Sequence, residues 1–383
     1  MMAGINRIQI ILLGVVAGLV LNACRKEDPL VDKLNPPPAD TPFQATPYIL
    51  QLPLGWSAPP IPANNPLTVE GVALGRKLFY DPILSANNTQ SCGSCHNQQF
   101  GFTDNGKQFS VGIDNIAGNR QSMPIFNLAW VERFAPVIGS KPYRFFWDGG
   151  AADLESQVVG PITNPIEMHD SLPHVLAKLQ AHPQYPELFQ KAFGTSEIKT
   201  IHLMKAIAQF ERTILSSQSK FDNFLIHVTP TGTKFFDFSV FTPEEKNGHD
   251  VFMDETRGDC FHCHPVSTPF TTDFLFHNNG HTSNDPGLRR ITGNPDDQGK
   301  FRAATLRNLL LTAPYMHDGR FQTLEEVVEF YNSGANRSYP ADPFITKHPT
   351  GLNLSNQDKS DLVAFLKTMT DSAFLLKTDY GKP

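Results

Sequence analysis

Cys92-Gly93-Ser94-Cys95-His96 and Cys260-Phe261-His262-Cys263-His264 are two copies of one pattern, Cys-x-x-Cys-His. Two thiols at this spacing can form thioethers with the vinyl groups of a haem, and the histidine that follows is placed to ligate its iron. Two copies in one chain are a strong indication of a dihaem c-type cytochrome. The predicted haem-binding residues are Cys92, Cys95, His96, Cys260, Cys263 and His264. Electron transfer or redox catalysis is therefore the expected function.

Zinc is the alternative ligand for paired cysteines. A zinc ribbon usually places its cysteine pairs much closer in sequence than Cys95 and Cys260 are here. A histidine also follows each second cysteine directly, and the N-terminal segment predicts export, which suits covalent haem attachment. These observations favour haem.

The chain has five cysteines, and the one outside the two motifs, Cys24, ends an N-terminal targeting segment. A positive charge at Arg7 precedes an apolar run over Ile10–Val20, and Leu21-Asn22-Ala23-Cys24 is similar to a lipobox, in which the cysteine is lipidated. The run is too short for a stable transmembrane helix. We predict an exported lipoprotein, anchored to a membrane through Cys24 and facing the periplasm or the cell exterior. An ordinary cleaved signal or an uncleaved anchor is the alternative.

Length and composition predict two domains behind a tether. The chain has 383 residues and a formal net charge of −6, so nothing indicates nucleic acid as a partner. Prolines such as Pro36-Pro37-Pro38 favour extended chain. We predict a lipoprotein signal peptide over 1–24, a tether over 25–65, an N-terminal haem domain over 66–235 and a C-terminal haem domain over 236–383.

A faint internal repeat places a helix before each haem motif. Gly75-Arg76-Lys77-Leu78-Phe79 precedes the first motif, and Gly248-His249-Asp250-Val251-Phe252, on a helix capped by Thr242, precedes the second. Another helix is predicted to start at Ser355. Its apolar residues lie mostly on one face: Leu362, Val363, Phe365, Leu366 and Met369. Strand signals are sparse. The predicted class is mainly α, with two cytochrome c-like haem domains and long loops.

Over roughly residues 66 to 375 the chain resembles the bacterial dihaem cytochrome c peroxidase and MauG family. The matching stretches are Leu74-Gly75-Arg76-Lys77-Leu78-Phe79-Tyr80-Asp81-Pro82, Phe146-Trp147-Asp148-Gly149, Gly160-Pro161-Ile162-Thr163-Asn164-Pro165-Ile166-Glu167-Met168, Thr305-Leu306-Arg307-Asn308 and Thr312-Ala313-Pro314-Tyr315-Met316-His317-Asp318-Gly319. Their order and spacing relative to the haem motifs match too. The resemblance implies an oxidoreductase that uses hydrogen peroxide and carries two covalent haems.

The resemblance also implies the catalytic residues at the N-terminal haem. In the family a glutamine lies ten residues, and a glutamate twenty residues, after a tryptophan between the haems. Counting from Trp147 gives Gln157 and Glu167. Glu167 would move a proton between the peroxide oxygens, Gln157 would orient the peroxide, and Pro161 matches a distal-pocket proline. The alternatives are a solvated loop carboxylate for Glu167 and a core side chain, instead of an electron relay, for Trp147.

Two departures from the ordinary peroxidases favour a MauG-like variant. No histidine lies between Asn97 and Glu167, so the first haem is expected to be open at rest without reductive activation. Counting fourteen residues from His317, where the peroxidases have a methionine ligand to the second haem, gives Tyr331, and MauG has a tyrosine there. A tyrosine oxygen would stabilise higher iron oxidation states, whereas a thioether favours ferrous iron. The alternatives are Met316 as the ligand, or Tyr331 as a core aromatic on the helix Leu324–Tyr331.

A calcium ion and a protein partner complete the implied set. In the family, backbone carbonyls hold calcium between the domains, and the matching positions are Asn127, Thr312 and Pro314. The partner would be a small electron donor, a cytochrome c or a cupredoxin, or a protein substrate in a MauG-like enzyme. A dihaem electron-transfer or sensory cytochrome without peroxide turnover is the remaining alternative, and the presence of Glu167 and Gln157 argues against it.

Overall fold

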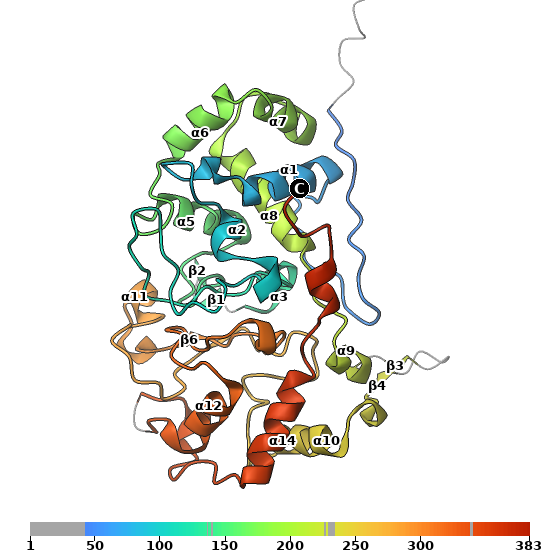
Figure 1. Ribbon diagram of the computed structural model, residues 1–383, viewed down its shortest axis with the longest axis vertical. Coiled ribbons are helices and arrows are strands. Elements are labelled where there is room, and N and C mark those ends of the chain that lie inside the picture. Colours follow the sequence, from blue (N-terminus) through green and yellow to red (C-terminus); the bar gives the residue numbers. More distant parts are fainter. Residues whose placement is uncertain (1–42, 136, 139–140, 226, 229–233, 338–339) are drawn as a thin grey trace, which may run out of the picture. The chain divides into compact units, whose positions relative to one another are not determined.

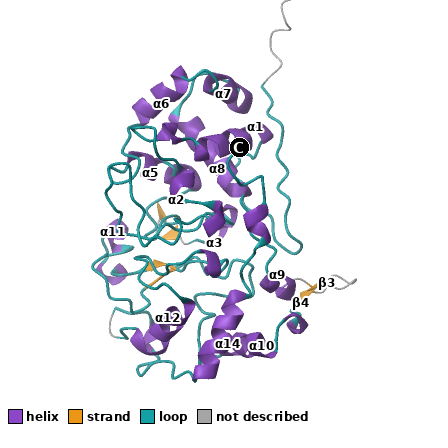
Figure 2. Cartoon of the chain, in the orientation of Figure 1, coloured by secondary structure: helices purple, strands orange, loops and turns teal. Residues whose placement is uncertain are grey.

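The computed structural model describes residues 43–383 except 136, 139–140, 226, 229–233 and 338–339 (Figure 1). The predicted lipidation site Cys24 and the first part of the predicted tether lie outside the described residues. Helices and long loops dominate, and the named strands form only two-residue antiparallel pairs (Figure 2). The mainly helical class is thereby confirmed. Among the described helices, none has the length and apolar character needed to cross a membrane.

The helices are α1 Val69–Tyr80, α2 Cys92–Cys95, α3 Val131–Phe134, α4 Leu154–Gln157, α5 Val159–Thr163, α6 Leu172–Ala181, α7 Tyr185–Phe193, α8 Thr200–Thr213, α9 Lys220–Leu225, α10 Pro243–Met253, α11 Arg289–Thr292, α12 Leu324–Glu329, α13 Pro343–Thr346 and α14 Asn356–Lys367. The strand pairs are β1 Val137–Ile138 with β2 Lys141–Pro142, β3 His227–Val228 with β4 Lys234–Phe235, and β5 Phe276–His277 with β6 Phe301–Arg302.

The first hydrophobic core forms where α1 packs against α8. α1 begins after Thr68, whose hydroxyl accepts a hydrogen bond from Gly71 N at 3.0 Å. The buried side chains of the two helices include Leu74, Leu78, Phe79, Leu203, Ala206 and Phe210. Phe374 and Tyr380 are buried in the same core, so the C-terminal segment returns to the first half of the chain, beside α1 in Figure 1.

The second core forms where α10 packs against α14. Thr242 and Glu245 form the predicted capping box at the start of α10, and Ser355 caps α14 as predicted. The core side chains of these helices and of the turn after α14 are Val251, Phe252, Leu362, Val363, Phe365, Leu366 and Met369. Phe221 and Phe224 of α9 also join this core. The domain boundary between residues 235 and 236 stays a prediction.

The described part of the predicted tether, residues 44–65, contains no helix or named strand, but it is packed against the body. Trp56 is buried, and its ring lies 5.1 Å from that of Trp130 and 5.2 Å from that of Phe270. Trp130 Nε1 donates to Ser57 O at 2.8 Å, and the buried Asn65 donates to Glu155. This segment is therefore part of the globular unit instead of a free spacer.

The internal repeat corresponds to two equivalent helix contacts. A Cβ atom placed on Gly75 in α1 would lie 1.8 Å from Ala206 O in α8. A Cβ atom placed on Gly248 in α10 would lie 1.9 Å from Asp361 O in α14. In each half a glycine thus lets two helix backbones approach more closely than any side chain would permit.

We expect Gly75→Ala and Gly248→Ala each to destabilise the protein. Alanine in a helix is favoured over glycine by about 1 kcal/mol, but overpacking a close contact costs roughly 1–3 kcal/mol, and here the blocking atom is backbone. Chemical denaturation of the holoprotein should show lower stability for both variants. Glu244→Ala, on the exposed side of α10, is the control and should change little. Unchanged or higher stability of the glycine variants would contradict this account of the repeat.

Candidate active site

The first haem motif is held by a short helix and a loop. Ser91 and Ser94 form a capping box around α2, which carries Cys92 and Cys95 half-buried. His96 ends this helix, and its Nδ1 lies 2.9 Å from Phe102 O. Because a carbonyl only accepts, Nδ1 carries the proton and Nε2 keeps the lone pair needed to bind iron. Burial lowers the pKa of His96, which also favours the neutral ligand form.

The second motif repeats this arrangement. Cys260 and Cys263 are half-buried, and His264 Nδ1 lies 3.1 Å from Thr271 O. Burial lowers the pKa of His264 as well. In both halves a backbone carbonyl therefore fixes the imidazole tautomer and leaves Nε2 available.

A cavity of about 620 Å³ lies against the first motif and collects the predicted catalytic side chains. Cys92, Cys95 and His96 line it together with Gln157, Pro161 and Glu167. Gln157 comes from the end of α4, Pro161 from α5, and Glu167 from the loop that follows α5. The structure thus brings together residues that are far apart in sequence, and Glu167 is not a solvated surface carboxylate.

Glu167 is held by one neighbouring amide. Asn164 Nδ2 donates to Glu167 Oε1 at 2.6 Å. Burial raises the pKa of Glu167, and the hydrogen bond from Asn164 opposes part of that rise. A carboxyl group with a raised pKa is suited to both accepting and donating a proton.

The described residues that line the first cavity include His96 and no second histidine. His169, the next histidine after Glu167 in the chain, pairs with Asp114 and has a side chain that is 53% exposed. That the first haem has no distal histidine from this region stays a prediction.

A second cavity, of about 250 Å³, lies against the second motif. Tyr331 and Met316 both line it, and the Asn279 amide contacts both side chains, at 2.9 Å from the Tyr331 hydroxyl and 3.6 Å from the Met316 sulfur. Burial raises the pKa of Tyr331. The two candidate ligands are thus neighbours at one amide in the second cavity.

The predicted continuous helix Leu324–Tyr331 is wrong in its second part. α12 ends at Glu329, and Phe330–Gly334 form a single π-helical turn that carries Tyr331. Such turns are often found at functional sites because they redirect one side chain out of the regular helical register. Leu324, Val327 and Tyr331 nevertheless line the same cavity, as the helical pattern predicts.

One wall separates the two cavities. Gln121, Pro124, Trp147 and Arg302 line both of them, and we call these four residues the shared wall. Trp147 Nε1 donates to Gln121 O at 2.8 Å, and Arg302 N donates to Trp147 O at 2.9 Å. Trp147 is therefore fixed between the two sites, which is the position expected of a relay.

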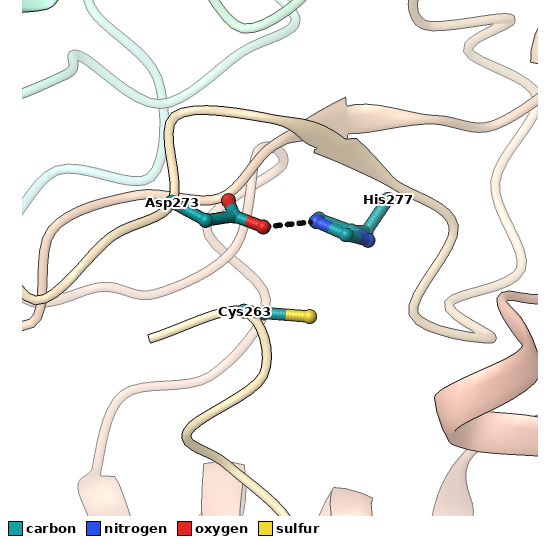
Figure 3. A group of neighbouring side chains, drawn as sticks. All are labelled: Cys263, Asp273 and His277. Atoms are coloured by element: carbon teal, nitrogen blue, oxygen red, sulfur yellow. Dashed lines mark hydrogen bonds and ion pairs between the residues drawn. The ribbon is translucent and has the colours of Figure 1, made fainter. Parts of the chain in front are cut away.

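A histidine between two aspartates lies at the second cavity, and Figure 3 shows His277 with one of them, Asp273. His277 Nε2 lies 2.8 Å from an Asp273 oxygen, and Nδ1 lies 2.7 Å from an Asp342 oxygen. Burial would lower the pKa of His277, but the two carboxylates raise it to about 12, so the ring is protonated. Cys263 lies beside this pair. Because both ring nitrogens donate protons, the group is a charged wall of the haem site and not a metal site of its own.

The predicted calcium ligands have other polar contacts. The Asn127 side chain pairs with the backbone of Ser216 at 3.0 Å in both directions, and Thr312 O lies 3.5 Å from the Gln121 amide. Pro314 lines the second cavity. Calcium binding stays a prediction.

Three site residues escaped the sequence analysis. Asn164 lies within 160–168, a stretch that resembles the family, so its three-residue offset from Glu167 is a signal that could identify it. Glu211 and Arg302 also line the first cavity. Local sequence gives no signal for these two, because charged residues are ordinarily read as surface positions.

Both cavities fit a covalently attached haem. Each has two thiols and one imidazole nitrogen at its edge, with the imidazole tautomer that iron requires. Arg302, buried in the shared wall without an anionic partner among the described residues, also fits a ligand that carries carboxylates.

Comparisons with known proteins agree with this geometry. The profile of the family described as di-haem cytochrome c peroxidase matches residues 69–229. Over 323 residues the chain is 35% identical to the methylamine utilization protein MauG of Methylorubrum extorquens, covering 81% of both chains. It is 34% identical over 323 residues to the cytochrome c551 peroxidase of Nitrosomonas europaea, covering 81% of this chain and 83% of that one. The crystal structure of a MauG-like protein associated with microbial copper homeostasis is similar at a TM-score of 0.73 and 31% identity, covering 88% of this chain and 99% of that one.

Proposed function

Because the chain belongs to the dihaem cytochrome c peroxidase family, we propose that it reduces hydrogen peroxide in the first cavity. Members of this family are oxidoreductases of the peroxidase or MauG type and carry two c-type haems. One observation carries the proposal: Gln157, Pro161 and Glu167 line the cavity of the first haem motif, and Trp147 lines both cavities.

Each residue has a separate part in this proposal. The bound haems supply iron that binds peroxide and exchanges electrons with it. Glu167 accepts a proton from one peroxide oxygen and returns it to the other. Because its pKa is raised, accepting the proton and donating it are close in free energy. Gln157 donates its amide hydrogen bonds to orient the substrate. Asn164 holds the Glu167 carboxylate toward the cavity through its 2.6 Å hydrogen bond.

Electrons from an external donor protein enter, in this proposal, at the second site and cross the shared wall through Trp147. The two hydrogen bonds to Gln121 O and from Arg302 N hold the indole in one orientation. A fixed aromatic ring between two redox centres needs no rearrangement when an electron passes.

Glu167→Gln should reduce peroxide turnover by roughly 100-fold or more, the scale expected when a proton shuttle is removed. The change keeps the size of the side chain and its hydrogen bonding, so both haems should remain attached. Steady-state kinetics with peroxide and a reduced donor protein measure the effect, and mass spectrometry confirms the haem content. Glu187→Gln, an exposed substitution of the same kind, is the control. Near-normal kinetics of the Glu167 variant would end its assignment as the shuttle.

Asn164→Ser should shift the acid limb of the pH–rate profile to higher pH. Asn164 donates to Glu167 and thereby favours its charged form, so loss of the donor raises the pKa of Glu167 further. The base is active when deprotonated, and its activity is lost as pH falls through that pKa. Serine can still accept the hydrogen bond that Ile166 N now donates to Asn164. An acid limb at the wild-type position would show that Asn164 does not tune Glu167.

A second candidate function, oxidative modification of a partner protein as in a MauG-like enzyme, is favoured by the Tyr331 hydroxyl in the second cavity. We propose that Tyr331 ligates the second iron. Tyrosine oxygen stabilises high oxidation states, which would let oxidising equivalents spread over both haems instead of being consumed by a donor.

A pair of variants separates the two candidate ligands. Tyr331→Phe should change the spectrum and raise the midpoint potential of the second haem, because an oxygen ligand that stabilises ferric iron is lost. Met316→Leu should leave both unchanged. Potentiometric titration followed by absorbance measures this. The reverse result would identify Met316 as the ligand and favour an ordinary cytochrome c peroxidase.

We further propose calcium binding by the carbonyls of Asn127, Thr312 and Pro314, and a lipid anchor at Cys24 on a protein exported to the periplasm or the cell exterior. Atomic emission analysis before and after chelation tests for calcium, and a calcium-free protein with full activity would exclude the site.

Labelling with a radioactive fatty acid tests for the lipid anchor, and the label should be absent in Cys24→Ala. A soluble wild-type protein without label would exclude it.

A further inference from the structure

Arg302 is a buried cation for which the described part of the chain supplies no anion. It lies at the end of β6, and only 7% of the residue is exposed. Its Nε and Nη2 atoms have no hydrogen-bond partner among the described residues. The neighbours of the guanidinium are two aromatic rings, Phe145 at 5.9 Å and Phe276 at 5.8 Å from its central carbon.

The other two arginines that are as deeply buried among the described residues, Arg212 and Arg307, are neutralised. Arg212 pairs with Glu155 at 2.7 Å, and Arg307 pairs with Asp222 at 2.6 Å. Arg120, at the edge of the first cavity, pairs with Asp148 and Asp285, each at 2.7 Å. Burying a charge without a partner is strongly unfavourable. Burial lowers the pKa of Arg302 to about 9, in agreement with the lack of an ion pair to this side chain among the described residues.

The position of Arg302 identifies the missing anion by its chemistry. The residue lines both cavities, so its partner belongs to whatever fills them. A haem attached through its vinyl groups keeps two free propionate carboxylates. A guanidinium presents N–H donors in a planar fork that matches a carboxylate.

We propose that Arg302 is the propionate-binding residue of the shared wall, and that its side chain pairs with haem carboxylate at the boundary of the two sites while its backbone N–H holds Trp147. Arg302 is a positioning residue: it would fix a haem edge beside the tryptophan. Its positive charge would also stabilise the reduced irons and thus raise their midpoint potentials. The inference rests on the proposed function only in requiring two bound haems.

The test compares Arg302→Met, which removes the charge at similar length, with Arg302→Lys, which keeps the charge but loses the fork. Holoproteins with two haems, counted by mass spectrometry, are titrated potentiometrically without peroxide. Arg302→Met should lower the midpoint potential of at least one haem, and Arg302→Lys should lie nearer to wild type. Arg289→Met, which removes an exposed arginine of α11, should change neither potential.

Potentials of Arg302→Met that equal those of wild type, with both haems present, would overturn the proposal. If the methionine variant loses haem while the lysine variant keeps both, the requirement for charge is supported directly. If both variants lose haem equally, Arg302 acts through its shape and the proposal fails. Because no step uses peroxide, these outcomes are independent of the role of Glu167.

Discussion

The fixed position of Trp147 is the constraint on which both sites depend. Its ring and its backbone are held from opposite halves of the sequence, by Gln121 O and by Arg302 N. The next residue, Asp148, is 1% exposed and forms ion pairs with Arg120 and Arg290. Arg120 also forms an ion pair with Asp285. Removing one partner of the largely buried Arg120–Asp148 pair costs about 3–5 kcal/mol. That is a large part of the roughly 5–15 kcal/mol that stabilises a typical domain, so the ion pair beside Trp147 contributes to the stability of the whole fold.

The two halves reach this wall by the same construction. Each has a pair of helices joined at a glycine, Gly75 against α8 and Gly248 against α14, and each leads from that pair to a haem motif. Close helix packing fixes where the following loop begins, so the histidine of each motif faces its cavity with the same tautomer. The C-terminal segment then packs on the first core through Phe374 and Tyr380 and connects the halves a second time.

Sequence alone could predict what depends on local spacing. The haem motifs and the caps at Thr242 and Ser355 each have a fixed separation along the chain, whereas Gln157 and Glu167 follow from the family resemblance. The burial of Trp56 and the missing partner of Arg302 depend on residues far away in sequence, and no local pattern encodes them. Tyr331 lies on a π-helical turn and Met316 in the loop before α12, and their meeting at the Asn279 amide is likewise a contact that no local pattern encodes.

Burial also explains the charge state of the sites. It raises the pKa of Glu167 and brings that of Glu211, whose Oε2 has no partner among the described residues, to about 8, so both acids shift toward their neutral forms. It lowers the pKa of His96 and His264, which makes these imidazoles neutral too. Arg302, with a pKa of about 9, remains charged at neutral pH. Burial therefore moves the pKa of the acids in the first cavity upward, toward the range in which a carboxyl group can both take up and release a proton, while the shared wall retains a cation.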